Sequence, residues 1–204
     1  MPYFLIVLLF FTLSIPSFAF DVSELGDFSS RSIIEGKIYN RQSAITQEQR
    51  DLLTYKKLVP NSKCLFEQIK KGNYENVKIL LQAKVNPNQS YLSEYPIYIA
   101  AKENKFDILK LLYENNAKLD RGFYSELYEA LRNKNAEMAQ YLLDRGAKVN
   151  YMDSITNNTI LYMALKNKMY DLASQIILKG AKADTRSVKY IKKHNLGYLI
   201  PQGQ

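Results

Sequence analysis

The chain of 204 residues contains one cysteine, Cys64, and one histidine, His194. A thiol and an imidazole can form a nucleophilic pair, but only when the fold brings them within hydrogen-bond reach. Cys64 lies at the start of a long repetitive region and His194 follows its end, so we expect them at opposite ends of the molecule. A single cysteine cannot form an intrachain disulfide. We expect Cys64, at the start of a predicted helix, to be a small buried core residue rather than a reactive thiol.

Other patterns typical of enzymes and cofactor sites are absent from the sequence. It has no glycine-rich phosphate loop and no cluster of metal-ligand residues. Four carboxylates, Glu75, Asp107, Glu137 and Asp171, recur at one position near a predicted helix start, where negative charge favours the exposed backbone N–H groups. We therefore predict a protein that is not an enzyme and has no cofactor, metal or small-molecule substrate.

The carboxylates belong to a unit that recurs four times without a gap. The segments 63–88, 95–120, 125–150 and 159–184 align on one another, and each ends in Asn or Asp. Equivalent ends are 32, 30 and 34 residues apart, and all of that variation lies in the spacers between segments. Repetition at this period indicates an array of stacked supersecondary units.

The second unit shows most clearly how one repeat folds. Pro96 suits the first turn of a helix, and apolar residues follow at helical spacing up to a break at Asn104. A second apolar stripe then ends at Asn116, where later units have Gly146 and Gly180, so a left-handed helix cap is expected. Each unit is thus predicted to be a short helix pair. A single pair buries too little surface to be stable, and neighbours must stack.

An array of this kind needs a cap at each end. Upstream, residues 46–49 have the capping-box pattern, and we predict an N-terminal capping helix over 46–61. Downstream, residues 185–204 form a degenerate C-terminal capping unit and tail with a basic amphipathic stretch from Ser187. With their spacers, the four repeats occupy 63–94, 95–124, 125–158 and 159–184.

These units resemble the ankyrin repeat. The family's opening pattern of threonine, proline, leucine and histidine with later paired alanines is similar to residues 95–101, and its closing pattern to residues 142–150. Only Thr159 keeps the opening threonine. An aromatic column replaces the histidine in every unit, and we interpret this column as packing rather than a ligand-stacking ladder: Phe66, Tyr98, Tyr128 and Tyr162.

The resemblance implies an all-α solenoid whose spacers project as hairpin-like finger loops and whose first helices line a concave groove. It also implies a non-enzymatic scaffold that binds proteins through these surfaces. Large apolar side chains on connections are typical of contact surfaces, although some could instead fold back over the helices. The candidate partner-binding residues are the large apolar residues of the spacers and three cations: Tyr91, Leu92, Phe123, Tyr124, Tyr151, Met152, Ile155, Lys102, Arg132 and Lys166.

The formal net charge of +8 favours an acidic protein partner. Stacking would bring the cations of two repeat positions into rows, which would either attract such a partner or form a solvated face. No nucleic-acid-binding motif is present and the cations are interleaved with acids, so no nucleic acid is expected. The two rows consist of Lys70, Lys102, Arg132 and Lys166, and of Lys118, Lys148 and Lys182.

The N-terminus differs from the repeats. Residues 4–13 are almost entirely apolar, and Pro16 follows with the small residues Ser17 and Ala19 ahead of a cut after Ala19. This pattern predicts a secretory signal peptide over 1–19 and a polar lead over 20–45. The chain is then exported, periplasmic or secreted. An uncleaved inner-membrane anchor is the alternative, and membrane contact is expected only in that case. As an exported protein, the chain would act as an adaptor or, alternatively, as a periplasmic inhibitor or protective partner of one enzyme.

Overall fold

The computed structural model describes residues 45–200, so the predicted signal peptide and nearly all of the polar lead lie outside the described residues. Residues 45–200 form helices and no regular strand. None of these helices combines the length and apolar character needed to cross a bilayer. The helices are α4 (Gln47–Tyr55), α5 (Ser62–Lys71), α6 (Tyr74–Gln82), α7 (Pro96–Lys102), α8 (Phe106–Glu114), α9 (Glu126–Arg132), α10 (Ala136–Asp144), α11 (Ile160–Lys166), α12 (Tyr170–Leu178), α13 (Thr185–Lys193) and the short 3₁₀ helix η2 (Gly197–Leu199).

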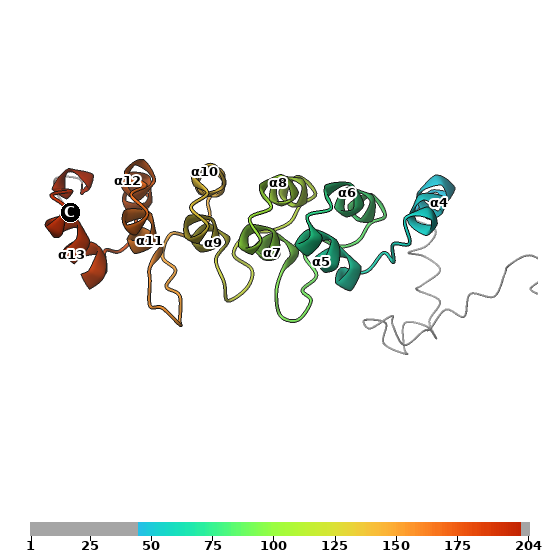
Figure 1. The fold of residues 1–204 in the computed structure, drawn as a ribbon, viewed down its shortest axis with the longest axis horizontal. Helices are drawn as coiled ribbons and strands as arrows, with labels where there is room; N and C mark the ends of the chain where they lie inside the picture. Colours follow the sequence, from blue (N-terminus) through green and yellow to red (C-terminus); the bar gives the residue numbers. More distant parts are fainter. Residues whose placement is uncertain (1–44, 201–204) are drawn as a thin grey trace, which may run out of the picture. The chain divides into compact units, whose positions relative to one another are not determined.

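The helices of the repeats stand in two layers along a row (Figure 1). The first helix of each repeat packs on its own second helix and on the first helix of the next repeat, so α5, α7, α9, α11 and α13 form one layer. The second helices, α6, α8, α10 and α12, form the other. The predicted all-α array of stacked helix pairs is confirmed.

Local sequence signals fix where the helices begin. The Ser125 and Thr159 hydroxyls accept N–H bonds from the backbone three residues ahead, and the Asn61 side chain does the same for α5. Pro96 occupies the first turn of α7. The four recurring acids, Glu75, Asp107, Glu137 and Asp171, lie in the first turns of the second helices, as predicted.

The core is one continuous cluster that runs through all repeats, from Leu53 in α4 to Leu199 in η2. Its fully buried residues come from both layers, for example Leu109 and Leu142 from second helices and Ile99 from a first helix. The small residue Ala100 is also fully buried and lets neighbouring helices approach closely. No repeat has a core of its own, so each depends on its neighbours.

Polar clamps also join each repeat to the next. The Asn88 side chain donates to the Asn116 carbonyl (2.7 Å) and accepts from the Lys118 N–H (2.8 Å). Asn150 makes the equivalent pair of bonds to the closing turn of the last repeat, at 2.9 and 2.8 Å. Asp120, which can only accept, takes the Lys148 N–H at 2.8 Å. These bonds explain why the first three repeats end in Asn or Asp, whereas Asp184, at the end of the fourth, caps α13 instead.

The ends of the array are closed by different elements. At the N-terminal end, Thr46 and Gln49 form the predicted capping box of α4, which packs on α6. Within the predicted capping segment 46–61, α4 is helical only to Tyr55, because Lys57 turns at φ 53° and Pro60 follows. At the other end, α13 packs on α11 and η2 packs on α12.

The turns after the second helices are left-handed in every repeat. Asn116, Gly146 and Gly180 have φ values of 68°, 79° and 87°, which confirms the predicted caps. The first repeat has Lys84 at this position, with φ 64°. A lysine is disfavoured there because its Cβ crowds the backbone.

We expect Lys84→Gly to raise the free energy of unfolding by about 1 kcal/mol, because it relieves this strain at an exposed position. Urea unfolding followed by circular dichroism measures the change. Lys78→Gly is the matched control: Lys78 is exposed in the interior of α6, and the same substitution there should cost about 1 kcal/mol. A loss of stability in both variants would contradict the prediction.

Candidate partner-binding surface

Three loops project from the first-helix side of the array (Figure 1). They are the spacers between repeats, which we call the first finger (89–94), the second finger (121–124) and the third finger (151–158). A bridge between Tyr91 and Glu94 closes the first finger, and a bridge between Met152 and Thr159 closes the third. The spacers therefore protrude as the resemblance implied.

An aromatic pair holds the base of each finger. In the first finger, Tyr91 packs on Phe66 with ring centroids 5.5 Å apart. In the second, Tyr124 stacks on Tyr98 at 4.8 Å, and in the third, Tyr151 packs on Tyr128 at 5.4 Å. Phe66, Tyr98 and Tyr128 are buried and Tyr162 is half-buried, as the packing interpretation of this column predicted. The predicted contact residues Tyr91 and Tyr151 thus fold back against the core, and Tyr124 remains partly exposed.

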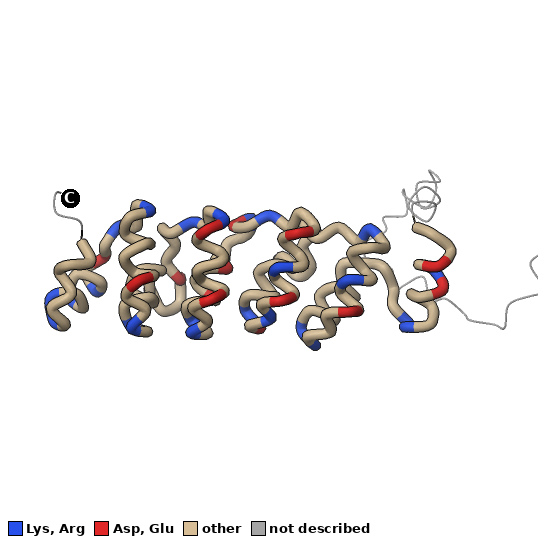
Figure 2. Tube along the Cα trace, turned by 90° about the horizontal axis from the view of Figure 1, so that it is seen from above, with Lys and Arg blue, Asp and Glu red and all other residues tan. Residues whose placement is uncertain are grey.

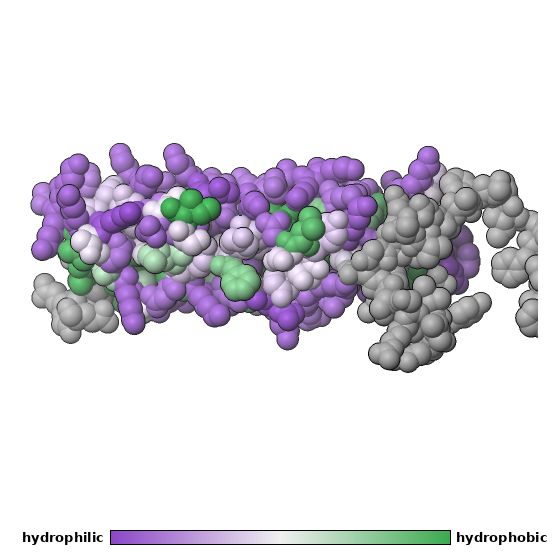
Figure 3. Space-filling model, turned by 90° about the horizontal axis from the view of Figure 1, so that it is seen from below, coloured by the Kyte–Doolittle hydropathy of each residue, from purple (hydrophilic) through white to green (hydrophobic). Residues whose placement is uncertain are grey.

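The tips of the fingers present aliphatic and aromatic side chains to solvent. Phe123 is 89% exposed, Ile155 88% and Leu92 76%, and Met152 is also exposed. Figure 3 shows separate apolar groups along the face that bears the fingers, surrounded by polar residues. Of the predicted contact residues, these four are the ones that a partner can reach most fully.

The tip of the first finger is also strained. Leu92 and Ser93 have φ values of 50° and 63°, the left-handed conformation that the two central residues of a type I′ turn require. Asn and Gly are the residues usually found there, because a leucine pays a steric penalty in this region. The backbone conformation of Leu92 therefore costs stability, and its exposed side chain adds no burial.

The third finger is anchored from two sides. The Tyr128 and Thr156 hydroxyls lie 3.1 Å apart, and Asp153 accepts both the N–H and the hydroxyl of Thr156. From α13, the Arg186 guanidinium donates to the Thr156 carbonyl and to the Asn158 side chain, both at 2.9 Å. The role of Arg186 was missed in the sequence, because nothing in the pattern links the terminal cap to a spacer about 30 residues earlier.

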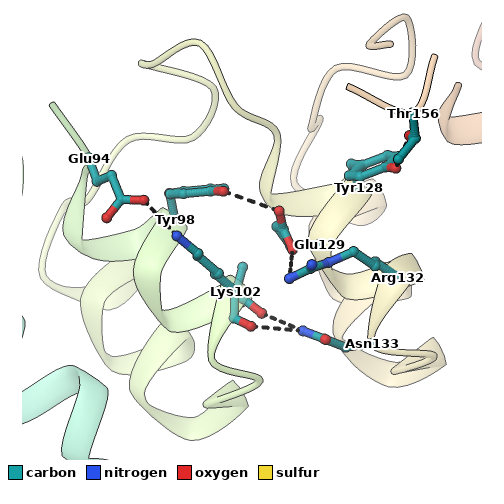
Figure 4. A network of polar contacts seen from close by, with 9 residues as sticks. Glu94, Tyr98, Lys102, Tyr128, Glu129, Arg132, Asn133 and Thr156 are labelled. Carbon is teal, nitrogen blue, oxygen red and sulfur yellow. Dashed lines mark hydrogen bonds and ion pairs between the residues drawn. The ribbon is translucent and has the colours of Figure 1, made fainter. Parts of the chain in front are cut away.

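Figure 4 shows a network of charged and polar side chains from α7, α9 and the neighbouring fingers. The Lys102 ammonium lies 2.8 Å from the Glu94 carboxylate, a contact that raises the pKa of Lys102. Arg132 is paired with Glu129 at 2.7 Å, and the Tyr98 hydroxyl donates to the same carboxylate at 3.1 Å. The two cations therefore have acidic partners within the fold.

These ion pairs reduce the positive charge that the predicted row of cations presents to a partner. Lys102 and Arg132, at its centre, are largely neutralised by Glu94 and Glu129. Lys166, nearer the C-terminal end, is exposed. The row therefore does not present a continuous positive stripe. The second row, Lys118, Lys148 and Lys182, is exposed on the closing turns.

Glu126 is a buried carboxylate at the base of the second finger. Its side chain is 1% exposed and accepts the backbone N–H of Asp120 at 3.1 Å. Burial raises the pKa of Glu126 to about 7, and the nearby Asp120 carboxylate adds to this while hydrogen bonds and Lys148 oppose it. Burial also raises the pKa of Asp120. Sequence reasoning missed this pair, because Glu126 resembles an ordinary acid in the first turn of a helix.

The residues singled out for chemistry do not come together. Cys64 is half-buried in α5, and burial raises the pKa of its thiol, so the expected full burial is only partly met. His194 follows α13 and packs on Tyr190 at 4.3 Å, at the far end of the row from α5 (Figure 1). Among residues 45–200, no group of His, Cys, Asp and Glu is arranged to hold a metal ion.

Comparison with known proteins agrees with this geometry. Residues 65–153 match the family model described as ankyrin repeats, in three copies. An ankyrin repeat protein of Rickettsia felis is 32% identical over 95 residues, which cover 44% of this chain and 31% of the relative. The human ankyrin repeat and SOCS box protein 11 is 32% identical over 88 residues, 42% of this chain and 27% of the relative. α-Latroinsectotoxin-Lt1a of Latrodectus tredecimguttatus is 34% identical over 71 residues, 32% of this chain and 5% of the relative. The matches thus span less than a third of each relative.

Because the pKa of the buried Glu126 is raised, we expect the free energy of unfolding to depend on pH. Between about pH 4.5 and pH 7 the folded chain keeps a proton that the unfolded chain has released, so stability falls as pH rises through this window. Above pH 7 the buried Glu126 carboxylate is ionised, and this lowers the free energy of unfolding by up to about 3 kcal/mol. Glu126→Gln should remove this term, so its stability relative to wild type should grow between pH 4.5 and pH 8.

Urea unfolding at several pH values measures this difference. Glu137→Gln is the control, because Glu137 is an exposed acid in the first turn of α10. A pH profile for Glu126→Gln that matches the Glu137→Gln profile would show that burial of Glu126 is not the cause.

Proposed function

Because the array is built of ankyrin repeats, which generally serve as scaffolds for protein–protein interaction, we propose that this chain binds a partner protein through its finger tips. The proposal is for a non-enzymatic adaptor whose contacts centre on Leu92, Phe123 and Ile155. The single observation that carries it is the strained and exposed Leu92. A residue that strains its turn while its large apolar side chain stays in solvent is best explained by a contact made outside the chain.

The arrangement of the three tips supports this proposal. Each finger has one aromatic residue at its base that packs inward, and each presents at least one large apolar residue that does not. The bases fix the position of the loops while the tips stay free. Preformed loops lose less conformational entropy on binding, which favours affinity.

Charge has a secondary role in this proposal. Lys102 and Arg132 are already paired, so a partner with acidic residues over the middle of the array would have to displace Glu94 or Glu129. Lys166, at the end of α11 in the fourth repeat, offers an exposed cation. We therefore favour a partner that is mainly apolar where it meets the fingers, with acidic groups toward the C-terminal half.

Site-specific photo-crosslinking in native cells tests the contact surface. We expect crosslinks to a common protein from positions 92, 123 and 155, and none from position 78, which is exposed on the second-helix layer. A stoichiometric complex with one enzyme would favour the inhibitor role over the adaptor role. Crosslinks from position 78 alone would overturn the finger proposal.

Stability and binding should change in opposite directions at the first finger. Leu92→Asn with Ser93→Gly places favoured residues in the type I′ turn, so we expect the free energy of unfolding to rise by about 1 kcal/mol. The same variant should give a weaker crosslink from position 123. Phe123→Ser and Ile155→Ser should weaken binding with little change in stability. Unchanged binding in all three variants would contradict the role of the tips.

We also propose that the chain is exported, on the basis of the apolar segment 4–13 and the small residues before Ala19. Residues 1–19 would then be removed. N-terminal sequencing of the protein isolated from its native cells should give a start at Phe20. Recovery of a chain that begins at Met1 and sediments with membranes would favour the uncleaved anchor.

A further inference from the structure

The positive charge of the chain is concentrated at the C-terminal end of the array. Residues 172–200 contain six Lys and Arg residues against one acid, Asp184, which gives a net charge of +5 out of +8 for the whole chain. Asp184 is occupied as the N-cap of α13, where it accepts from the backbone of Arg186 and Ser187 and from the Thr159 hydroxyl. No acid follows it in residues 185–200. Figure 2 shows Lys and Arg positions along this terminal helix.

The free cations lie on one side of α13. Ser187 and Ile191 are buried and form the side that packs on α11. Lys189, Lys192 and Lys193 are exposed at the spacing i, i+3 and i+4, so they share the opposite side of the helix. Among the described residues α13 is the last helix of its layer, and no further repeat covers this side (Figure 1). We call Lys189, Lys192 and Lys193 the lysine face.

The lysine face differs from the basic residues elsewhere in the array. Lys102 and Arg132 have carboxylate partners, and the guanidinium of Arg186 is used to hold the third finger. The remaining cations of the terminal helix are lysines. A lysine acts as a mobile point charge, which suits diffuse attraction to a charged surface, whereas Arg suits bidentate recognition of one group.

Exposed apolar residues lie in the same terminal part of the array. Tyr198, on η2, is 72% exposed, and Leu178 at the end of α12 and Ile200 after η2 are also exposed. Since η2 packs on α12, these residues belong to the same closing unit. Lysines combined with an aromatic and aliphatic residues match an anionic lipid surface, where the cations meet headgroups and the apolar side chains enter the interface. A duplex DNA backbone or a purely acidic peptide such as polyglutamate offers no apolar region for these side chains, so it would use the charge alone.

We propose that the C-terminal cap docks the array on an anionic lipid surface, with the lysine face against the headgroups and Tyr198 in the interfacial region. This contact is independent of the N-terminal apolar segment and of the finger tips. It would leave the fingers free for a partner protein while the array is held at a membrane.

Co-sedimentation of the full chain with vesicles tests this proposal. We expect binding to vesicles of phosphatidylcholine with phosphatidylglycerol and much weaker binding to phosphatidylcholine alone. The triple variant Lys189→Gln, Lys192→Gln, Lys193→Gln should weaken binding to the anionic vesicles by about 100-fold, since each lysine near such a surface contributes roughly a factor of five. The weakening should shrink at high salt.

The matched control removes three exposed lysines elsewhere: Lys78→Gln, Lys118→Gln and Lys148→Gln. It has the same net charge as the first triple variant, and both retain the N-terminal segment. We expect the control to lose far less binding than the lysine-face variant. Equal losses in the two variants, or no loss in either, would overturn the proposal. Circular dichroism confirms that both variants are folded.

Tyr198→Ser separates lipid from other anionic partners. We expect it to weaken binding to the anionic vesicles several-fold and to leave binding to polyglutamate or duplex DNA unchanged, because a lipid interface accepts an apolar side chain and these two polyanions offer no apolar region for it. Binding of polyglutamate or DNA that depends on the lysine face, without vesicle binding, would overturn the lipid assignment and identify an acidic protein or nucleic acid instead.

Discussion

Each repeat is completed by contacts with its neighbours, and this dependence governs the rest of the structure. The apolar core passes through every repeat without a break, and the side chains of Asn88, Asp120 and Asn150 satisfy backbone groups of the repeat that follows. A backbone group left without such a partner would cost stability. A substitution at one closing residue therefore affects two repeats at once, and the array must be closed at both ends.

The stacking of helices explains why the spacers can protrude. Because the helices supply the core, the loops contribute only their aromatic bases, Tyr91, Tyr124 and Tyr151, which pack on the aromatic column of the first helices. The large apolar side chains at their tips are then not needed for the core. At Leu92 the demands of folding and of contact oppose one another, since the turn favours Asn and a partner would favour an apolar side chain.

The distribution of charge differs between the middle of the array and its C-terminal end. Over the middle repeats, cations and acids are paired within the fold, and Glu129 is held by both Arg132 and Tyr98. At the C-terminal end, where no further repeat follows among the described residues, lysines remain without a facing acid from residues 185–200. The middle of the array is thus close to neutral and its end is basic, so the two regions suit different kinds of partner.

The sequence by itself determined the periodic part of this protein. Helix starts, left-handed caps such as Asn116 and the stacking of pairs depend on residue types at fixed local spacing, which a pattern states directly. The place of Phe123 and Ile155 in spacers made them candidates for a contact surface, but their exposure was left open by the sequence and is seen only in the structure. Only the tertiary structure decided that Tyr91 folds back while Leu92 does not, that Glu126 is buried, and that Arg186 reaches the third finger. These facts depend on distances between residues of different repeats and on how closely their side chains pack, and a pattern of residue types contains neither.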